Sequence, residues 1–286
     1  MPSLKAIKRR IGSVKSTRQI TKAMDLVAAA KLARVKARLE ASRALGGIAS
    51  GMIDELCRHP VASASIYATP PAKSDTSAYL VISGERGLCG GYNTNISRLT
   101  LEHIRESGKD EYILALGVRG QTYLTRRGMH VRHSMPGLVE KADYHDAEMI
   151  ARLLLEGYIA GKYDEVFVSY TKFASTVSHT PTVERVLPLE VAEDKGPLPS
   201  PVGEMRYESG PVAFLEEALP TCLAMFIHSA MVESSVCEQA ARMVSMDAAS
   251  KNADDIIENL TLTYNRSRQQ AITQEINEIV GGANAV

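Results

Sequence analysis

The opening of the chain, Met1–Leu39, reads MPSLKAIKRRIGSVKSTRQITKAMDLVAAAKLARVKARL and has the apolar spacing of a long helix. The heptad seam begins with Leu4, Ile7, Ile11 and Val14. Ser3 is a suitable cap, and His59-Pro60 is a suitable stop, so one helix is predicted as far as about Arg58. At 1.5 Å per residue this helix is about 80 Å long. A globular domain does not need such a helix, so we expect it to project from a globular body.

The closing stretch, Ala271–Val286, reads AITQEINEIVGGANAV and ends a second long helical segment. This helix is predicted to start near Pro211, to break or kink at Pro220, and to span about 90 Å from there. Because a helix of this length needs lateral packing to persist in water, it requires a partner. Its near-heptad apolar positions are Val232, Val236, Ala240, Met243, Met246, Ala253, Ile257, Leu260 and Tyr264. The first helix is the available partner, so the two terminal helices are predicted to form an antiparallel coiled coil.

The apolar stripe of the first helix changes phase part of the way along. Continuing the heptad reaches Arg18, Thr21 and Asp25, which are poor seam residues. The apolar positions instead shift by one residue, and they are Ile20, Met24 and Val27 until the first phase resumes at Ala28. One interpretation is an ordinary stutter, which changes the local winding of a coiled coil. The other is that this face turns away from the helical partner towards another subunit.

Composition is typical of a soluble protein of about two domains. The 286 residues carry 33 Lys and Arg against 33 Asp and Glu, which disfavours a uniformly basic nucleic-acid binder. The charge is nonetheless asymmetric, because residues 1–40 are basic and the residues from Glu233 onward are mainly acidic. We therefore expect the first helix to lie beside the second helix or beside an acidic partner.

Cysteine usage and the N-terminus narrow the class further. The four cysteines show no CxxC spacing, so a reducing compartment is expected and a zinc site is not. The N-terminus lacks an apolar signal core, and no run of about 18 apolar residues is expected to span a bilayer. The chain is interpreted as mature sequence without a transit peptide.

The middle of the chain alternates strands with helices. Ala78–Ser83 (AYLVIS) is predicted as a buried strand, and the Gly-rich loop GERGLCGGYN follows it. Further strands are predicted near 111–117, 129–134, 164–170 and 182–189, and helices near 94–107, 118–127 and 145–161. Such alternation predicts an α/β domain with a mostly parallel sheet covered on both faces. The predicted division is a shaft of 1–60 and 208–286, a linker of 61–77 and a central α/β domain of 78–207.

Three features invite a catalytic interpretation. The loop Gly84–Gly91 lies between a strand and a helix, where phosphate cradles occur, but it matches neither GxGxxG nor the P-loop. Cys89 is a potential nucleophile, yet nothing marks a histidine such as His103, His133 or His179 as its base. The set Asp143, His145, Asp146 and Glu148 is interpreted as a helix start rather than a metal site. The alternatives left open are a nucleotide-binding α/β enzyme and a coiled-coil scaffold or nucleic-acid binder.

Four blocks spread along the whole chain resemble the γ subunit of F-type ATP synthases. They are LKAIKRRIGSVKSTRQITKAMDLVAAAKL, SGERGLCGGYN, TPTVERVLPL and the closing AARMVSMDAASKNADD…YNRSRQQAITQEINEIVGGANAV. The terminal family pattern I-T-x-E-x-x-E-x-x-x-G-A falls on Ile272, Thr273, Glu275, Glu278, Gly282 and Ala283. The resemblance implies the same antiparallel coiled coil with a Rossmann-like central domain. It also implies a non-catalytic rotor shaft without cofactor or metal.

The resemblance also implies partners and contact residues. The shaft would turn inside a ring of α and β subunits, with its foot on the membrane c ring and on ε, and would couple proton or sodium movement to ATP synthesis or hydrolysis. Implied contacts with the α/β ring are Lys22, Met24, Arg242, Arg266, Arg268, Gln269, Thr273 and Glu275. Tyr207 and Glu208 match the foot near the c ring and ε.

Further expectations accompany the resemblance. Met24 and Arg268 are expected at one level of the shaft, and Thr273–Val286 is expected to overhang the first helix. The regulatory cysteine insertion of chloroplast γ subunits is absent, so thiol switching is not expected. A bacterial source is favoured, with the protein peripheral at the cytoplasmic face of the cell membrane.

Overall fold

The computed structural model describes residues 3–58, 60–70, 73–191 and 210–283. Its helices are α1 (Leu4–Leu56), the 3-10 turn η1 (Pro60–Ala64), α2 (Tyr92–Ser107), α3 (Val118–Thr125), α4 (Leu138–Lys141), α5 (Tyr144–Ile159) and α6 (Pro211–Ala283). Its strands are β1 (Thr76–Ile82), β2 (Asp110–Leu116), β3 (Val131–Met135), β4 (Glu165–Phe173) and β5 (His179–Leu187). The predicted order of elements is confirmed, with shifts of a few residues at their ends.

The five strands form one sheet in the order β3-β2-β1-β4-β5. The pairings β1–β2, β1–β4 and β2–β3 are parallel, and β4–β5 is antiparallel, so the predicted mostly parallel sheet is confirmed. The antiparallel edge arises because the short loop after Phe173 is a hairpin connection, and parallel neighbours need a longer crossover.

Strand β1 lies at the centre of the α/β domain. Ala78, Tyr79, Leu80, Val81 and Ile82 are all fully buried, and successive side chains of a strand point to opposite faces. The sheet must therefore be covered on both faces, as near-continuous apolar strands of parallel sheets require. One face forms a core cluster composed of Tyr79, Val81, Leu101, Ile104, Ile113, Leu124 and Phe167.

Helix α6 is continuous for 73 residues, about 110 Å at 1.5 Å per residue. Of the predicted break or kink at Pro220, a break is wrong, because the helix runs through this residue. Proline removes one backbone hydrogen bond and crowds the preceding turn, which costs about 3 kcal/mol in an exposed helix. Here the neighbouring turns are anchored by buried apolar side chains, namely Leu215, Leu219, Cys222 and Leu223. Their packing offsets the local loss.

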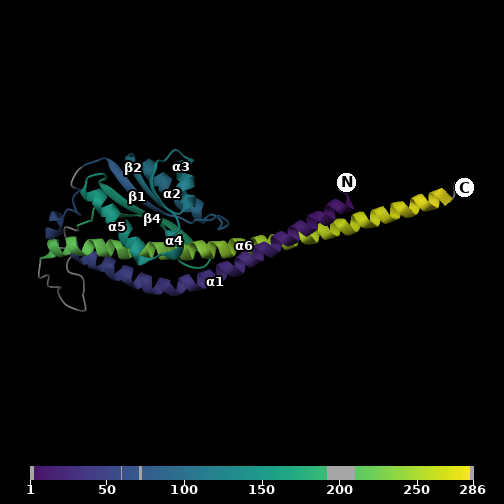
Figure 1. Cartoon of the computed structure of the whole chain (residues 1–286), viewed down its shortest axis with the longest axis horizontal. Coiled ribbons are helices and arrows are strands. Elements are labelled where there is room, and N and C mark those ends of the chain that lie inside the picture. The colour runs from purple at the N-terminus through teal and green to yellow at the C-terminus, as the bar shows by residue number, and fades with distance from the viewer. Residues whose placement is uncertain (1–2, 59, 71–72, 192–209, 284–286) are drawn as a thin grey trace. The chain divides into compact units, whose positions relative to one another are not determined.

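The structure comprises two compact units, and both long helices contribute to each. One unit contains residues 1–29 and 242–286, and the other contains residues 30–241. The first unit is a pair of helices, and the second contains the α/β domain with the remaining parts of α1 and α6 (Figure 1).

Two polar contacts set the register of the helix pair. The hydroxyls of Thr21 and Ser250 lie 2.8 Å apart, and Arg18 Nε lies 2.5 Å from Asp254 Oδ1. Moving three residues towards the N-terminus on α1 moves four residues towards the C-terminus on α6, so the pair is antiparallel, as predicted. The same register places Leu4 opposite about residue 267. Beyond that level α6 continues past the N-terminal end of α1 (Figure 1).

The seam of α1 keeps its heptad phase through the polar stretch. Asp25 and Ala28 are buried and Thr21 is half-buried, whereas Ile20 and Val27 are exposed. The predicted stutter is therefore wrong. Polar residues occupy the seam because α6 presents Ser250 and Asp254 as their hydrogen-bonding and ionic partners.

One helix in the described part of the chain is long and apolar enough to cross a membrane. It is α6, in which an 18-residue window between Pro211 and Asn277 reaches a mean hydropathy of 1.2 with 33% of its residues buried. The prediction that no such run exists is therefore wrong. Core helices meet the same criterion, and Leu215 of α6 is packed in a core cluster with Leu56 and Ala62.

The start of the parallel strands is held by a half-buried ionic cluster. Lys109 Nζ lies 3.1 Å from Asp164 Oδ1 and 3.0 Å from Glu165 Oε2, and Ser77 Oγ donates to Glu165 at 2.9 Å. Burial alone would raise the pKa of Glu165, but the hydrogen bonds from Lys109 and Ser77 outweigh it and lower the pKa. Glu165 therefore contributes stability above its unfolded pKa of about 4.3, and this contribution is lost as pH falls through the lower folded value.

Replacing Lys109 with Met should destabilise the protein at neutral pH. We expect a loss of about 1 kcal/mol, because Lys109 is partly exposed and solvent screens the pairs. Since Glu165 becomes protonated on acidification, the difference from wild type should shrink below about pH 4. Urea unfolding at pH 7 and pH 3.5 measures both values.

Arg98→Met is the matched control, because Arg98 and Glu102 form an exposed pair at 4.0 Å. Its removal should change stability by less than about 0.5 kcal/mol at either pH. An equal loss for Lys109→Met at both pH values would contradict this account of the cluster.

Candidate functional site

The strand order reverses between β1 and β4, which is the topological switch point of the sheet. Doubly wound sheets bind their ligands in the crevice at the carboxyl ends of the strands at such a point. The Gly-rich loop Gly84–Gly91 leaves β1 there. Extending the pairing of Val81 with Ser169 places residue 83 level with Thr171 at this edge. The switch point is therefore the place where a ligand site would be expected.

Helix α6 occupies this crevice. Every residue from Met231 to Ala240 is buried, so the helix is surrounded there on all sides. Ser234 Oγ accepts a hydrogen bond from the backbone N–H of Thr171 at 3.3 Å, and the Cys237 thiol donates to the Thr171 carbonyl at 3.4 Å. The chain's own helix thus takes the position that a bound ligand has in other folds of this kind.

The loop satisfies its own anion-binding groups. Glu85 Oε2 accepts from the N–H of Val118 at 3.3 Å, and Ser83 Oγ accepts from the N–H of Gly120 at 2.9 Å. Both donors belong to the first turn of α3, and free N–H groups in such a turn bind phosphate. A carboxylate already lies there, and Glu85 Oε1 also accepts from Gly137 N–H at 2.6 Å. This arrangement argues against the nucleotide-binding enzyme.

The loop is held as a tight turn by one asparagine. Asn93 Oδ1 accepts from Gly84 N–H at 2.8 Å, while its Nδ2 donates to the Arg86 carbonyl and to the Cys89 sulfur, each at 3.1 Å. Cys89 is buried by this turn. The predicted tight strand-to-helix turn is confirmed.

The histidines considered as bases for Cys89 have other partners. His103 Nδ1 lies 3.0 Å from the Tyr79 hydroxyl, and His133 Nε2 lies 2.9 Å from the Tyr112 hydroxyl. His179 lies beside the ring of Phe173, and burial lowers its pKa. None of these contacts activates a thiol.

The acidic set near 143–148 starts a helix, as predicted. Asp143 is the N-cap of α5, and its Oδ1 accepts from the N–H of His145 at 3.2 Å. Within the described residues, no group of three or more His, Cys, Asp or Glu side chains is placed to hold a metal ion.

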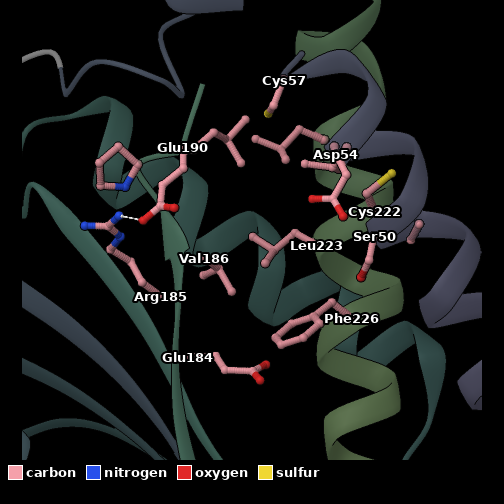
Figure 2. A pocket seen from close by; sticks show the side chains of 15 residues that line it. Ser50, Asp54, Cys57, Glu184, Arg185, Val186, Glu190, Cys222, Leu223 and Phe226 are labelled. Atoms are coloured by element: carbon pink, nitrogen blue, oxygen red, sulfur yellow. Dashed lines mark hydrogen bonds and ion pairs between the residues drawn. The ribbon is translucent and has the colours of Figure 1, made fainter. Parts of the chain in front are cut away.

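A cavity of about 340 Å³ lies between the C-terminal part of α1, the N-terminal part of α6 and strand β5 (Figure 2). Its walls include Phe226, Leu223 and Val186, with Cys57 and Cys222 on the two helices. Two of its three acidic lining residues are paired, Glu190 with Arg185 and Glu184 with Lys172. No histidine lines the cavity, and burial, followed by the nearby charge of Asp54, raises the pKa of Cys57 to about 11. The cavity therefore offers no activated nucleophile.

The contact residues implied by the resemblance fall at two levels of the helix pair. Lys22, Met24 and Arg242 lie within a few turns of one another, because the register places Met24 opposite about residue 247. Lys22 is exposed and bonds Asp25 at 2.8 Å, Met24 is half-buried, and Arg242 is buried. The hydrogen bond and charge of Asp25 raise the pKa of Lys22.

The second level lies about 30–40 Å further along α6. It contains the exposed residues Arg266, Arg268, Gln269, Thr273 and Glu275. The expectation that Met24 and Arg268 share one level is wrong, since Arg268 lies near the level of Leu4 at the N-terminal end of α1. Tyr207 and Glu208, the implied foot residues, lie outside the described residues.

Sequence reasoning missed several residues of the helix pair. Leu26 is 61% exposed, and Ile20 and Val27 on the same part of α1 are 58% and 56% exposed. Ser250 and Asp254, the partners that keep the seam in phase, were also missed. The heptad spacing of α1, in alternating steps of three and four residues, continues without a break through Arg18, Thr21 and Asp25. This continuity was the signal that would have found them.

These observations define a class of protein. The switch point is filled by α6, the helix N-terminus beside it is capped by Glu85, and the helix pair presents exposed apolar and basic residues to a partner. Such a chain is a structural subunit of an assembly whose chemistry takes place on other chains.

Comparison with known proteins agrees with this class. The protein-family model described as ATP synthase matches residues 3–286. The ATP synthase gamma chain of Desulforamulus reducens is 42% identical over 292 residues, with 100% of each chain covered. The sodium ion specific gamma chain of Acetobacterium woodii is 36% identical, covering 98% of this chain and 97% of that one. A chain in the Euglena gracilis mitochondrial ATP synthase structure, described as OSCP/F1/c-ring, has a similar fold, with a TM-score of 0.71 at 20% identity over 99% and 94% of the two chains.

The chain belongs to the ATP synthase gamma chain family. It is a non-catalytic subunit of that enzyme complex, as its filled switch point indicates.

The thiols should be unreactive in the folded chain. Cys57, Cys89, Cys222 and Cys237 are all free and buried, and burial is the main cause that raises the pKa of Cys57, Cys222 and Cys237. A pKa of about 11 instead of 9.0 lowers the thiolate fraction of Cys57 at pH 8 by about 100-fold. Timed reaction with Ellman's reagent at pH 8 should show slow native thiols and fast ones after denaturation.

Val177→Cys supplies the control, because Val177 is 79% exposed. The introduced thiol should react at the rate of a free cysteine. Native cysteines that react as fast as this one would contradict their described burial.

Proposed function

We propose that this chain is the rotating shaft of an ATP synthase, and that it carries torque between a membrane c ring and the catalytic β subunits. In this role it couples ion translocation to ATP synthesis or hydrolysis without chemistry of its own. The observation that carries the proposal is the antiparallel helix pair of residues 4–29 and 242–283, which leaves a partner-facing surface exposed at two levels.

The second level, towards the C-terminal end of α6, supports the role of a bearing surface. Ile272, Ile276 and Ile279 are 48%, 54% and 71% exposed on a helix that extends beyond its partner. A single exposed helix with apolar side chains needs an enclosing apolar surface to persist in water. A sleeve formed by the α and β subunits meets that need.

The first level, which contains Lys22 and Met24, supports a contact that transmits torque. Ile20, Leu26 and Val27 are exposed apolar residues of this part of α1, and the cations Arg18 and Lys22 lie in the same stretch of the helix. A partner with apolar side chains and carboxylates fits this surface, since complementary charges steer and orient contacts. We propose that the β subunits supply it, with Lys22, Met24 and Arg242 as contacts.

The remaining partners and the location complete the proposal. The foot, including Tyr207 and Glu208, would contact ε and the c ring, and the chain would be peripheral at the cytoplasmic face of a bacterial cell membrane. The Euglena structure named above contains F1 and a c-ring, which supports the choice of partners. The Acetobacterium relative is sodium specific, so sodium and protons are both candidate coupling ions.

Reconstitution tests the proposal directly. The purified chain alone should show no ATP hydrolysis, because its switch point is filled by α6 and its thiols are unactivated. Added to α and β subunits and to membranes stripped of F1, it should restore ATP-driven ion pumping. Failure to co-purify with α and β would count against the proposal, as would hydrolysis by the chain alone that survives repurification.

Met24→Lys tests the contact at the first level. If Met24 faces β, a new cation there should lower the number of ions pumped per ATP hydrolysed more than it lowers assembly. Both are measured on the reconstituted complex. Met149→Lys is the control, because Met149 is 47% exposed on α5 and should tolerate the charge. Collapsed assembly with normal pumping in the remaining complexes would show that Met24 only packs between helices.

A further inference from the structure

We propose that the contact between Glu238 of α6 and Gly84 of the Gly-rich loop prevents the α/β domain from rotating relative to α6. Glu238 acts as a positioning residue, and we call this contact the joint. The inference rests on the proposed rotor function, because a joint of this kind matters when torque passes between domain and shaft. It assigns a role to the loop that sequence reasoning left as a turn.

The joint depends on a close approach of the Glu238 carboxylate to Gly84. A Cβ placed on Gly84 would lie 2.8 Å from Glu238 Cδ, 2.9 Å from Glu238 Oε1 and 3.0 Å from Asn93 Oδ1. Real Cβ atoms do not approach other heavy atoms within 3.0 Å without displacement. Because Gly84 has no side chain, it leaves space just after β1, and the carboxylate of Glu238 lies in this space.

The choice of a carboxylate here is costly. Glu238 is 7% exposed, and burying a charged group is unfavourable unless polar contacts compensate. An apolar side chain of similar size would serve for packing alone. The Glu238 carboxylate also acts on the buried Tyr92. Burial is the main cause that raises the pKa of Tyr92, and the charge of Glu238 adds to it. A directional polar contact is the reason we infer for keeping a polar side chain of this length at this position.

Neighbouring contacts hold the same turn of α6 from other sides. Arg43 of α1 bonds Glu233 at 2.6 Å and donates to the carbonyl of Phe173 at the end of β4. Ser234 and Cys237 contact Thr171, as described above. The hydrophobic effect is non-directional, so it fixes the angle of a helix about its axis less specifically than a polar contact does. The contact of Glu238 with Gly84 resists rotation of α6 relative to the domain. Force on the domain therefore turns α6 with it.

Three variants of the full chain, reconstituted with α, β and F1-stripped membranes, test the joint. Glu238→Ala removes the contact, Glu238→Gln keeps the shape of the side chain, and Glu217→Ala makes the same truncation at an exposed site of α6. The measurements are the amount of assembled complex and the ions pumped per ATP hydrolysed. A merely structural role would change only the first.

We expect Glu238→Ala to assemble but to pump several-fold fewer ions per ATP, and Glu238→Gln and Glu217→Ala to match wild type. Gly84→Ala should also lower the ratio, since the methyl group displaces the carboxylate. A normal ratio in assembled Glu238→Ala complexes would overturn the inference, as would loss of assembly with a normal ratio in the remainder. Failure of the wild-type chain to restore pumping would instead refute the proposed rotor function.

Discussion

The structure depends on one constraint, which is that a 73-residue helix needs lateral packing along its whole length. Helix α6 meets this need in three different ways. Near its start it packs into the α/β domain and against α1, and between Met231 and Ala240 it is buried on all sides. Further along it pairs with the N-terminal part of α1. Its last turns extend beyond α1, and the apolar side chains of Ile272, Ile276 and Ile279 are exposed there.

The same constraint explains why an α/β domain of Rossmann-like topology has no ligand site at its switch point. The crevice that other such domains offer to a nucleotide is used here to hold a helix. Glu85 replaces a phosphate at the start of α3, and Asn93 closes the loop. The domain thus packs around α6, and Gly84 of the loop allows close approach to Glu238 of this helix.

Much of the fold was predictable, because strand alternation and helical spacing are local properties. The order of the five strands, the Ser3 cap and the helix at Asp143 follow from short stretches of sequence. Features set by distant partners were not predictable. Thr21 appears unfit for a seam until Ser250, which lies 229 residues away, is seen to bond it. Pro220 looks like a break until the buried turns around it are known. The filled switch point was missed for the same reason.

The central claim is that the helix pair turns against the β subunits. In a chain whose four cysteines are replaced, Ile20→Cys can be joined by a disulfide to a cysteine on the facing part of β. The account predicts that ATP hydrolysis stops when this bridge forms and resumes when a reductant breaks it. A bridge at Val280→Cys should inhibit less, because the last turns can unwind and swivel. Full hydrolysis with the Ile20 bridge shown to be formed would contradict the rotor account.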